Sequence, residues 1–408
     1  MQSNSKELKA TPRALPRGPV LDWSSFGRTN MPNIRSVESL PHTVFTTSGR
    51  AAIYQALLQL KLPADSAVLV PTYHCPTMVA PVLLAHLKVS YFGLLPNGLP
   101  HLDAIDPATR NECKAMLVPH YFGLAQSLNK VRKWCDEHGI ALIEDCAHCY
   151  FGEAGERAVG AWGDFATASL SKFFPVPEAG LLASAHRPIT PLQLENPSLK
   201  AQLKGWLDVM ELATRYQRLR GVGALLAPLF RFKNFRTQTP TAQETAVQPV
   251  ASAMMRECDM SRIRQTPLSA SMALKATLPR GRIIARRQQN FASYAAHFVD
   301  VPGARPLFPD TLNSAASTAP YVFPLWVDEP DEIYQALRSL KLPVFRWDRI
   351  WPGTPTLPQD MGPLWSHHVL QLLCHQDLST ADIDHTAEML SHLLKTQQAT
   401  LCPAETSR

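Results

Sequence analysis

The sequence predicts an α/β protein with a mostly parallel central sheet and a second, smaller α+β domain near the C-terminus. Short apolar runs recur between residues 43 and 185, and segments of helical periodicity separate them. Apolar strands that alternate with helices are typical of a parallel sheet covered on both faces. A strand–helix–strand–helix pattern over residues 321–394 predicts the smaller domain.

Six apolar runs are expected to form strands of the large sheet. They cover residues 67–70, 89–92, 115–118, 140–143, 165–168 and 181–184. Apolar residues recur at helical spacing over 51–60 and 126–138, and Gly139 follows the second segment as its expected C-cap.

The second half of the chain has a different pattern. Residues 194–230 are predicted to be helical with a basic side, and the polar stretch 237–252 interrupts the alternation. Further on, Ser379 and Asp382 resemble a capping box that opens a final helix ending near Leu394. The remaining expected elements are a long helix at 282–298, a strand at 321–327, a helix at 330–340 that begins with proline, and a strand at 369–373.

These elements predict three regions. An irregular, proline-rich N-terminal arm covers residues 1–42, and a large domain covers 43–260 with a helical, basic insertion near 194–252. A linking helix and the small C-terminal domain make up residues 261–408.

Composition excludes several classes of protein. The 408 residues contain 40 lysines and arginines against 34 aspartates and glutamates, a net charge of +6, without a block of like charges. This mild excess does not indicate a nucleic-acid partner. Eight cysteines in so long a chain do not suggest a disulfide scaffold. The first 30 residues lack the apolar core of a signal peptide, and the longest nearly apolar stretch, 221–230, is too short for a membrane span. We therefore expect a cytoplasmic protein.

Three features at the ends of expected elements could carry chemistry. Asp145 follows a buried strand, where a carboxylate serves either as a helix cap or as a fixed anion beside a basic nitrogen of a ligand. Lys172 follows another strand in an unusually apolar setting, which favours a desolvated, reactive amine over an ordinary solvated charge. Residues 47–50 open a helix whose free N–H groups could bind a phosphate, although an ordinary capped helix has the same pattern.

Together the three features fit one ligand. Pyridoxal phosphate needs a lysine for its aldehyde, a carboxylate for its pyridine nitrogen and an anion cradle for its phosphate. The chain order is the cradle, then Asp145, then Lys172 27 residues later. That order is typical of the large domain of a fold-type-I enzyme.

The chain resembles the DegT/StrS family of pyridoxal-phosphate-dependent sugar aminotransferases over about residues 40–395. No single motif carries the resemblance, which depends on the order and spacing of several. They are SGRAAIYQAL (48–57), VLVPTYHCPT (68–77), HYFG (120–123), LIEDCAHCYFG (142–152), GDFATASLSKFFPVPEAG (163–180), the helix with Arg286 and Arg287, and LLCHQDLSTADI (372–383).

The resemblance implies a role for each matching residue. Lys172 would hold the cofactor aldehyde as an imine and move the proton of the amino-transfer step. Asp145 would pair with the pyridine nitrogen. His148, where many members have glutamine, would donate to the ring oxygen. The phosphate would lie against Ser169 and the N–H groups of Gly49 and Arg50.

The chain also departs from the family pattern. Cys75 occupies the position of the usual ring-stacking aromatic residue, so Tyr73 or His74 is expected to replace it, and we take His74 as the cofactor contact. The common Asp-Gly-Gly after the lysine is Glu178-Ala179-Gly180 here. The Asn-Tyr-Arg motif with which a partner subunit reaches the phosphate is not found near 255–270.

The implied function is an aminotransferase of fold type I. It would move an amino group from an amino acid, glutamate by resemblance, to a keto acceptor such as a nucleotide-linked keto-sugar, in polysaccharide, glycoconjugate or secondary-metabolite biosynthesis. Family active sites form between subunits, which implies a homodimer.

Two other interpretations use the same scaffold. One is a dehydratase-type enzyme, but that branch has histidine in place of the lysine, and Lys172 is present. The other is a cofactor-bound sensor without turnover. A metal site is not expected, because the pair Cys146 and Cys149 has no second close pair of ligands. Trp347, in an aromatic cluster of the C-terminal part, belongs either to the core or to the substrate pocket.

Overall fold

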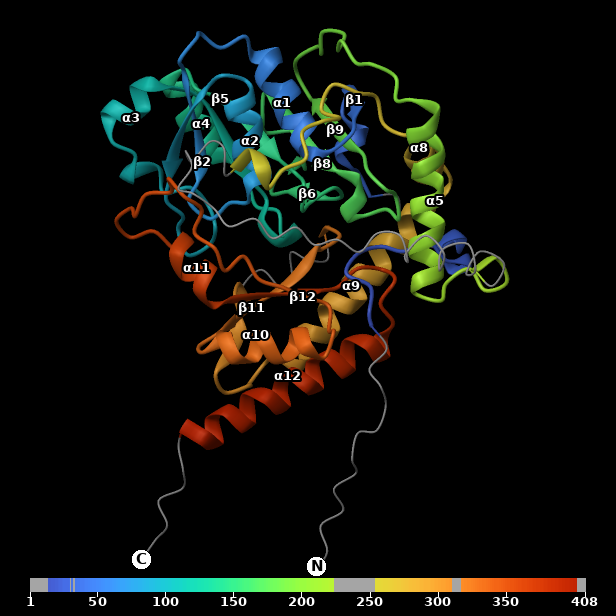
Figure 1. Cartoon of the computed structure of the whole chain (residues 1–408). Helices are drawn as coiled ribbons and strands as arrows, with labels where there is room; N and C mark the ends of the chain where they lie inside the picture. The colour runs from blue at the N-terminus through green and yellow to red at the C-terminus, as the bar shows by residue number, and fades with distance from the viewer. Residues whose placement is uncertain (1–13, 30, 32–33, 224–253, 310–316, 402–408) are drawn as a thin grey trace, which may run out of the picture.

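The computed structural model describes residues 14–29, 31, 34–223, 254–309 and 317–401. In Figure 1 a large sheet with its helices forms the upper part of the molecule, and a smaller sheet with α10 and α12 lies below it. The polar stretch predicted at 237–252 lies outside the described residues.

The large sheet has seven strands in the order β1-β9-β8-β5-β4-β2-β3. The five strands from β8 to β3 are parallel, and β9 runs antiparallel to them. The edge strand β1 pairs antiparallel with β9 and so has the same direction as the five. The α/β class predicted from the apolar runs is therefore confirmed. The strands are β1 (His42–Thr46), β2 (Ala67–Pro71), β3 (Lys88–Phe92), β4 (Cys113–Pro119), β5 (Ala141–Asp145), β8 (Phe165–Ser169) and β9 (Gly180–Ser184).

Both faces of this sheet are buried, which explains the continuous apolar runs. In β2, Val68 and Val70 pack in one core with the helices α1 and α2, whereas Leu69 between them packs in the core on the opposite face. Successive residues of a strand point to opposite faces, so a sheet covered on both sides needs apolar residues at every position. The helices of this part are α1 (Gly49–Leu60), α2 (Pro76–Leu84), α3 (Pro107–Glu112) and α4 (Asn129–His138).

A pair of helices stands at the side of the large sheet in Figure 1. They are α5 (Leu199–Arg215) and α8 (Ser269–Thr277). A Cβ on Gly205 would lie 2.7 Å from Leu268, so this glycine permits the close approach of α5 to the residues that precede α8. The helix predicted over 194–230 is shorter among the described residues, because Ser198 caps its start and the helix ends at Arg215.

The small sheet is antiparallel, in the order β10-β11-β13-β12. Phe323 of β11 contacts the rings of Phe291 and Tyr294 in α9 and of Phe298 at its C-cap, at centroid distances of 5.0–6.2 Å. The strands are β10 (Ala304–Pro306), β11 (Val322–Val327), β12 (Val344–Phe345) and β13 (Val369–Leu373). The helices are α9 (Arg280–His297), α10 (Pro330–Ser339), α11 (Gly362–His368) and α12 (Thr380–Leu401).

Two short strands and five 3₁₀ turns also occur among the described residues. The strands β6 (Glu153–Ala154) and β7 (Arg157–Ala158) form a small antiparallel hairpin. The 3₁₀ turns are η1 (Trp23–Phe26), η2 (Val37–Ser39), η3 (Leu102–Ala104), η4 (Tyr121–Gly123) and η5 (Leu170–Lys172).

The main differences from the sequence-based expectations lie at helix ends. The helix expected from residue 126 begins at Asn129, but it ends at the predicted C-cap Gly139, whose φ is +63°. The last helix continues to Leu401 instead of ending near Leu394. A helix end is set by local caps, and nothing in the apolar spacing marked the true end of α12.

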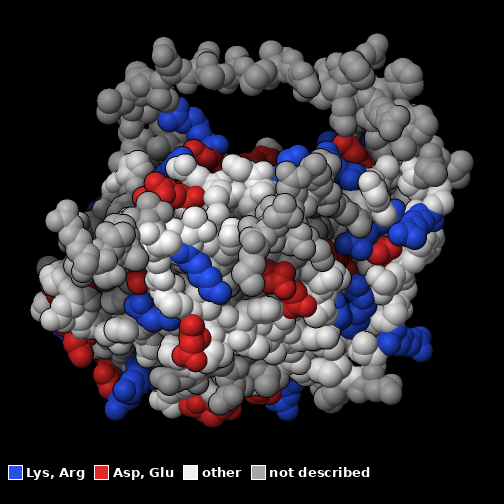
Figure 2. All heavy atoms as spheres, turned by 90° about the horizontal axis from the view of Figure 1, so that it is seen from below, with Lys and Arg blue, Asp and Glu red and all other residues white. Residues whose placement is uncertain are grey.

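Surface charge gives little indication of a partner. On the face shown in Figure 2, basic and acidic side chains are interspersed. Among the described residues no helix is both long enough and apolar enough to cross a lipid bilayer.

The capping box at the start of α12 yields a stability prediction. The Ser379 hydroxyl accepts the N–H of Asp382 at 3.2 Å, and the Asp382 carboxylate accepts the N–H of Ser379 at 2.8 Å. We expect Ser379→Ala to lower the free energy of unfolding by about 1 kcal/mol in urea titrations. Asp382→Ala should cost a similar amount, and the double variant should lose less than the sum, because the two side chains also bond each other at 2.7 Å. Strict additivity would contradict the reciprocal cap.

Candidate active site

Parallel strands bring the predicted site residues to one edge of the large sheet. Asp145, the last residue of β5, is paired with Pro119 of β4 on one side and with Thr167 of β8 on the other. Ser169 ends β8, and Lys172 lies in the η5 turn that follows. The carboxyl ends of adjacent parallel strands meet at the same edge, which is where α/β folds bind ligands.

The turn that carries Lys172 is fixed by backbone hydrogen bonds. The N–H of Leu170 donates to Ala179 O at 2.9 Å, and the N–H groups of Phe173 and Phe174 return to Leu170 O at 2.9 and 2.8 Å. The rings of Phe173 and Phe174 are fully buried beneath the turn. The backbone of the lysine is therefore held in the apolar setting that its neighbours in the sequence predicted.

The Lys172 amine lies among aromatic and polar groups. Its Nζ is 5.1 Å from the centroid of the Tyr321 ring. Burial lowers the pKa of this amine, while Cys75 and Asp145 act in the opposite direction. A lowered pKa increases the fraction of neutral, nucleophilic amine at neutral pH.

Asp145 is a buried carboxylate that is only partly bonded to the protein. Its Oδ1 accepts the N–H of Ala147 at 2.9 Å and the hydroxyl of Thr167 at 3.4 Å. Burial raises its pKa, and the Ala147 N–H and the charge of Lys172 oppose the rise. The side chain lines the same cavity as Lys172, so it can face a ligand there.

His148 is held in one protonation state by its surroundings. Burial and the nearby Lys172 lower its pKa far below the ordinary value, so the ring is neutral. Its Nδ1 accepts the N–H of Phe122 at 3.4 Å, which leaves the proton on Nε2. The ring stacks on Tyr321 at 4.4 Å. His148 is therefore a neutral donor beside the amine.

An anion cradle lies at the start of α1. The Ser48 hydroxyl accepts the N–H of Ala51 at 3.2 Å, and the first helical residue is Gly49. A Cβ on Gly49 would lie 3.4 Å from Ser169 Cβ, so the helix end approaches Ser169 closely. Arg50 follows and donates through Nε to Asp259 O at 2.7 Å. Free N–H groups at a helix N-terminus favour a phosphate.

One cavity of about 620 Å³ contains these groups. It is lined by Gly49, Arg50, Asp145, Ser169 and Lys172. Arg262 also lines it, and its buried Nη2 has no hydrogen-bond partner among the described residues. Pyridoxal phosphate requires an amine for its aldehyde, a carboxylate for its ring nitrogen and N–H donors for its phosphate. The cavity supplies all three kinds of group, so the residues present fit that cofactor.

Lys172 and Asp145 also line a second, smaller recess. Its lining includes Cys75, His148 and Trp347. His74 is absent from the lining of both cavities: its Nε2 bonds Thr354 Oγ1 at 3.0 Å, and its ring faces Tyr91. Cys75, the N-cap of α2, has extended backbone dihedrals, and successive side chains of extended backbone point to opposite sides. His74 therefore has no place among the residues that line the site.

Several residues of the site were missed by sequence reasoning. Tyr321 and Arg262 lie far from Lys172 in the sequence, and no motif marks them. Trp347 was noted as a possible pocket residue, and it does line the recess. Its neighbour in the predicted aromatic cluster, Trp365, is instead fully buried among core rings. Only the tertiary fold shows which of these two tryptophans lines the recess and which belongs to the core.

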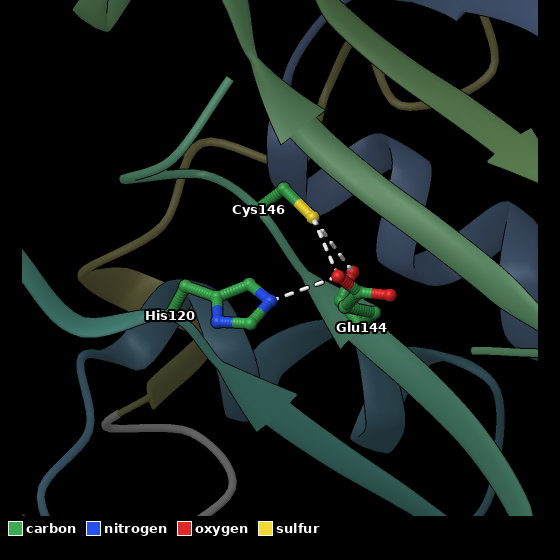
Figure 3. A group of neighbouring side chains, drawn as sticks. All are labelled: His120, Glu144 and Cys146. Carbon is green, nitrogen blue, oxygen red and sulfur yellow. Dashed lines mark hydrogen bonds and ion pairs between the residues drawn. The ribbon is translucent and has the colours of Figure 1, made fainter. Parts of the chain in front are cut away.

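Figure 3 shows a second polar group behind the site, in which His120 and Cys146 both point to the carboxylate of Glu144. The His120 Nε2 is 2.8 Å from Glu144 Oε1. Both carboxylate oxygens also accept backbone N–H groups at 2.6–3.2 Å, so a metal ion would have to displace existing donors. The group therefore fits a structural anchor for the turn that precedes β8. The donating N–H groups are those of Gly160, Trp162 and Gly163.

A largely parallel seven-stranded sheet, a lysine turn at its carboxyl edge and a smaller antiparallel unit agree with the fold-type-I architecture expected from the sequence. Residues 35–186 match the family model of the DegT/DnrJ/EryC1/StrS aminotransferase family. The resemblance inferred from the motifs is thus confirmed over the segment that contains the cradle, Asp145 and Lys172.

Curated relatives match less than half of the chain. The chain is 26% identical over 183 residues to GDP-perosamine synthase of Vibrio cholerae, a match covering 44% of this chain and 50% of that protein. It is 26% identical over 201 residues to UDP-N-acetyl-3-dehydro-alpha-D-glucosamine 3-aminotransferase of Acidithiobacillus ferrooxidans, covering 46% of this chain and 51% of that one. The chain spans about half the length of the curated relatives it matches.

Solved structures extend the likeness in fold. A putative sugar aminotransferase from Streptococcus pneumoniae, solved in its pyridoxal phosphate form, superposes with a TM-score of 0.59 at 15% identity. The match covers 88% of each chain. The fold, with both of its sheets, is therefore shared with this aminotransferase.

Ala179 provides a stability test within the site. Its φ is +136°, a region that favours glycine. Its N–H donates to Thr47 O at 3.0 Å and its carbonyl accepts from Leu170, so it joins the anion cradle to the lysine turn. Relief of about 1–3 kcal/mol of backbone strain should outweigh the entropic cost of glycine, about 0.5–1 kcal/mol.

We therefore expect Ala179→Gly to raise the free energy of unfolding by about 1 kcal/mol in chemical denaturation. The matched control is Ala183→Gly in β9, a regular strand position, which should lose about 1 kcal/mol. If both variants are destabilised equally, Ala179 carries no strain.

Proposed function

We propose that this protein is a pyridoxal-phosphate-dependent aminotransferase. It takes an amino group from an amino acid, glutamate in our proposal, and gives it to a keto acceptor, a nucleotide-linked keto-sugar. The observation that carries the proposal is the meeting of the Lys172 amine, the Asp145 carboxylate and the α1 cradle in one cavity of about 620 Å³.

The named relatives support the acceptor class. GDP-perosamine synthase and the UDP-sugar 3-aminotransferase are named for nucleotide-linked sugars. The segment that matches the family model includes most of the cavity residues. We infer the same class of acceptor here, used in polysaccharide, glycoconjugate or secondary-metabolite biosynthesis.

Pyridoxal phosphate supplies an aldehyde that carries the amino group and a ring that withdraws electrons from the reacting carbon. Asp145 would hold a proton on the ring nitrogen, because a buried carboxylate stabilises the cationic ring. His148 would donate its Nε2 proton to the ring oxygen. Gly49, Arg50 and Ser169 would hold the phosphate, and the Nη2 of Arg262, whose Nη1 is paired with Glu178, offers a further N–H donor in the same cavity.

Lys172 would act as the acid and base of the reaction. Burial lowers the pKa of its Nζ, which favours the neutral amine, so Lys172 would accept a proton from the substrate carbon and later return it. The backbone hydrogen bonds of the η5 turn hold the main chain of Lys172 beside the cavity.

The proposal includes a cytoplasmic homodimer. The seven cysteines that the structure describes are all unpaired, as expected in a reducing compartment. In domain terms, we propose an N-terminal arm (1–42), a cofactor-binding domain (43–260) and a linking helix with a small domain (261–408).

The first experiment is the visible absorption spectrum of the purified protein with and without glutamate. We expect a yellow band that glutamate bleaches, and borohydride reduction should attach the cofactor to the peptide that contains Lys172. Lys172→Ala should abolish this labelling and turnover while the far-ultraviolet circular dichroism stays unchanged. Lys204→Ala is the matched control: this lysine lines the same cavity but is exposed and paired with Asp208, so the band should persist.

The outcomes separate the proposal from its alternatives. A protein that binds the cofactor but shows no sustained turnover with any keto-sugar would be a sensor. A colourless protein that takes up no pyridoxal phosphate would overturn the proposal, as would transaminase activity retained in Lys172→Ala.

Asp145 gives an independent prediction. A hydrogen bond to a charged group contributes about 1.5–3 kcal/mol, so Asp145→Ala should weaken cofactor affinity by about 10–100-fold. Equilibrium dialysis and absorbance titration measure the effect. Asp145→Asn is the control, because its amide oxygen can still accept the Ala147 N–H but has no charge; its affinity should fall while the melting temperature stays near that of the wild type. Unchanged affinity in both variants would mean that another group holds the ring nitrogen.

A further inference from the structure

Arg287 is a buried cation at the junction of the two sheets. It lies in α9 and is 0% exposed. Among the described residues its guanidinium donates to neutral oxygens: Gln376 Oε1 at 2.9 Å, Pro320 O at 2.9 Å, and Lys172 O. Burying a charge costs several kcal/mol unless polar groups surround it, and an apolar residue would often pack there at lower cost. Because its hydrogen bonds go to the segments around Lys172, we infer that Arg287 orients these segments as well as filling space in the core.

Two of these contacts hold the turn that carries the lysine. Arg287 bonds the carbonyl of Lys172, and Gln376 donates through Nε2 to the next carbonyl, Phe173 O, at 2.7 Å. The guanidinium also lies over the Phe173 ring at 4.6 Å. Two consecutive carbonyls of the turn are thus held by two side chains that bond each other.

The third contact holds the segment that carries Tyr321, whose ring the amine faces. Pro320, whose carbonyl accepts from Arg287, directly precedes Tyr321. The N–H of Tyr321 donates to Phe122 O at 2.9 Å, and the Tyr321 ring lies both under Lys172 Nζ and against His148. One guanidinium therefore fixes the lysine backbone relative to the ring that its amine faces.

The segment that carries Gln376 is itself fastened to α9. Asn290 donates through Nδ2 to the carbonyls of Cys374, His375 and Leu378 at 3.1–3.3 Å. Arg282 donates to Asp377 Oδ1 at 2.9 Å. The loop between β13 and α12 is thus rigid enough to hold Gln376 in place.

We propose that Arg287, together with Gln376, is a positioning residue for Lys172, fixing the lysine turn against Tyr321 so that the amine stays enclosed in the cavity. This inference rests on the proposed function and deepens it. Arg287 touches the backbone of Lys172 and acts on the reaction only through that residue.

The amine is a direct reporter of this role. The groups that face it are Asp145, Cys75, His148 and Tyr321. Because enclosure lowers the pKa of Lys172, a loosened turn should admit water and raise the pKa toward its ordinary value. Loss of a nearby positive charge would act in the same direction.

The test is competitive labelling of Lys172 in the cofactor-free protein. Acetic anhydride is applied across a pH series, and peptide mass spectrometry gives the pH midpoint of the Lys172 reaction. We expect Arg287→Met to raise the midpoint by about one unit, which is a tenfold smaller fraction of neutral amine at neutral pH. Arg286→Met is the matched control on the same helix: Arg286 donates to Gln289 and to Leu378 O, not to the lysine turn, and its midpoint should equal that of the wild type.

A second variant covers the case in which Arg287→Met fails to fold. Gln376→Glu retains an acceptor for Arg287 and loses the donor to Phe173 O, so its midpoint should rise by less than that of Arg287→Met. In the holoenzyme both variants should lower kcat while the KM for glutamate changes little, because the substrate contacts are intact.

The outcomes distinguish this inference from the proposed function. An unchanged midpoint in folded Arg287→Met, or in Gln376→Glu if the first variant does not fold, overturns the positioning role. A wild-type protein that binds no pyridoxal phosphate overturns the proposed function instead, and the labelling result still decides whether Arg287 positions the amine.

Discussion

The register between β4, β5 and β8 is the constraint on which the site depends. It pairs Asp145 with Pro119 and with Thr167, and so places the carboxylate, the residue before His120 and the start of the lysine turn side by side. A slip of one residue would turn Asp145 to the opposite face, where Glu144 now points. The orientation of Glu144 toward that face is also fixed, because its carboxylate accepts three backbone N–H groups there. Two adjacent carboxylates thus fix the register from both sides of the sheet.

Much of the fold and part of the site could be predicted from local sequence. Strands buried on both faces require uninterrupted apolar runs, and those of β2, β4 and β5 were visible without a structure. Asp145 and Lys172 stood out because polar residues directly after such runs lie at the ligand edge of a parallel sheet. The start of α1 could be found because its caps are local.

The rest depended on contacts between residues distant in the sequence. His74 and Cys75 are adjacent, yet only Cys75, the N-cap of α2, lines the recess. Arg287 appeared as one of two arginines on a helix, and only the packed structure shows that it meets a carbonyl 115 residues away. Trp347 lines the recess and Trp365 lies in the core, because different residues surround them in the folded structure. No local pattern encodes these outcomes.

The contacts of the N-terminal arm bear on the order in which the site is completed during synthesis. Pro16 O bonds His375 Nε2 at a sequence separation of 359 residues, and the N–H of Val20 donates to Asp377 at a separation of 357. The strands of the large sheet leave the ribosome before the loop that receives the arm and carries Gln376. Long-range contacts of this kind form late in folding. The large sheet therefore positions the lysine turn first, and the contacts from the C-terminal loop form later. In a nascent or truncated chain, the Lys172 amine would lack these later contacts.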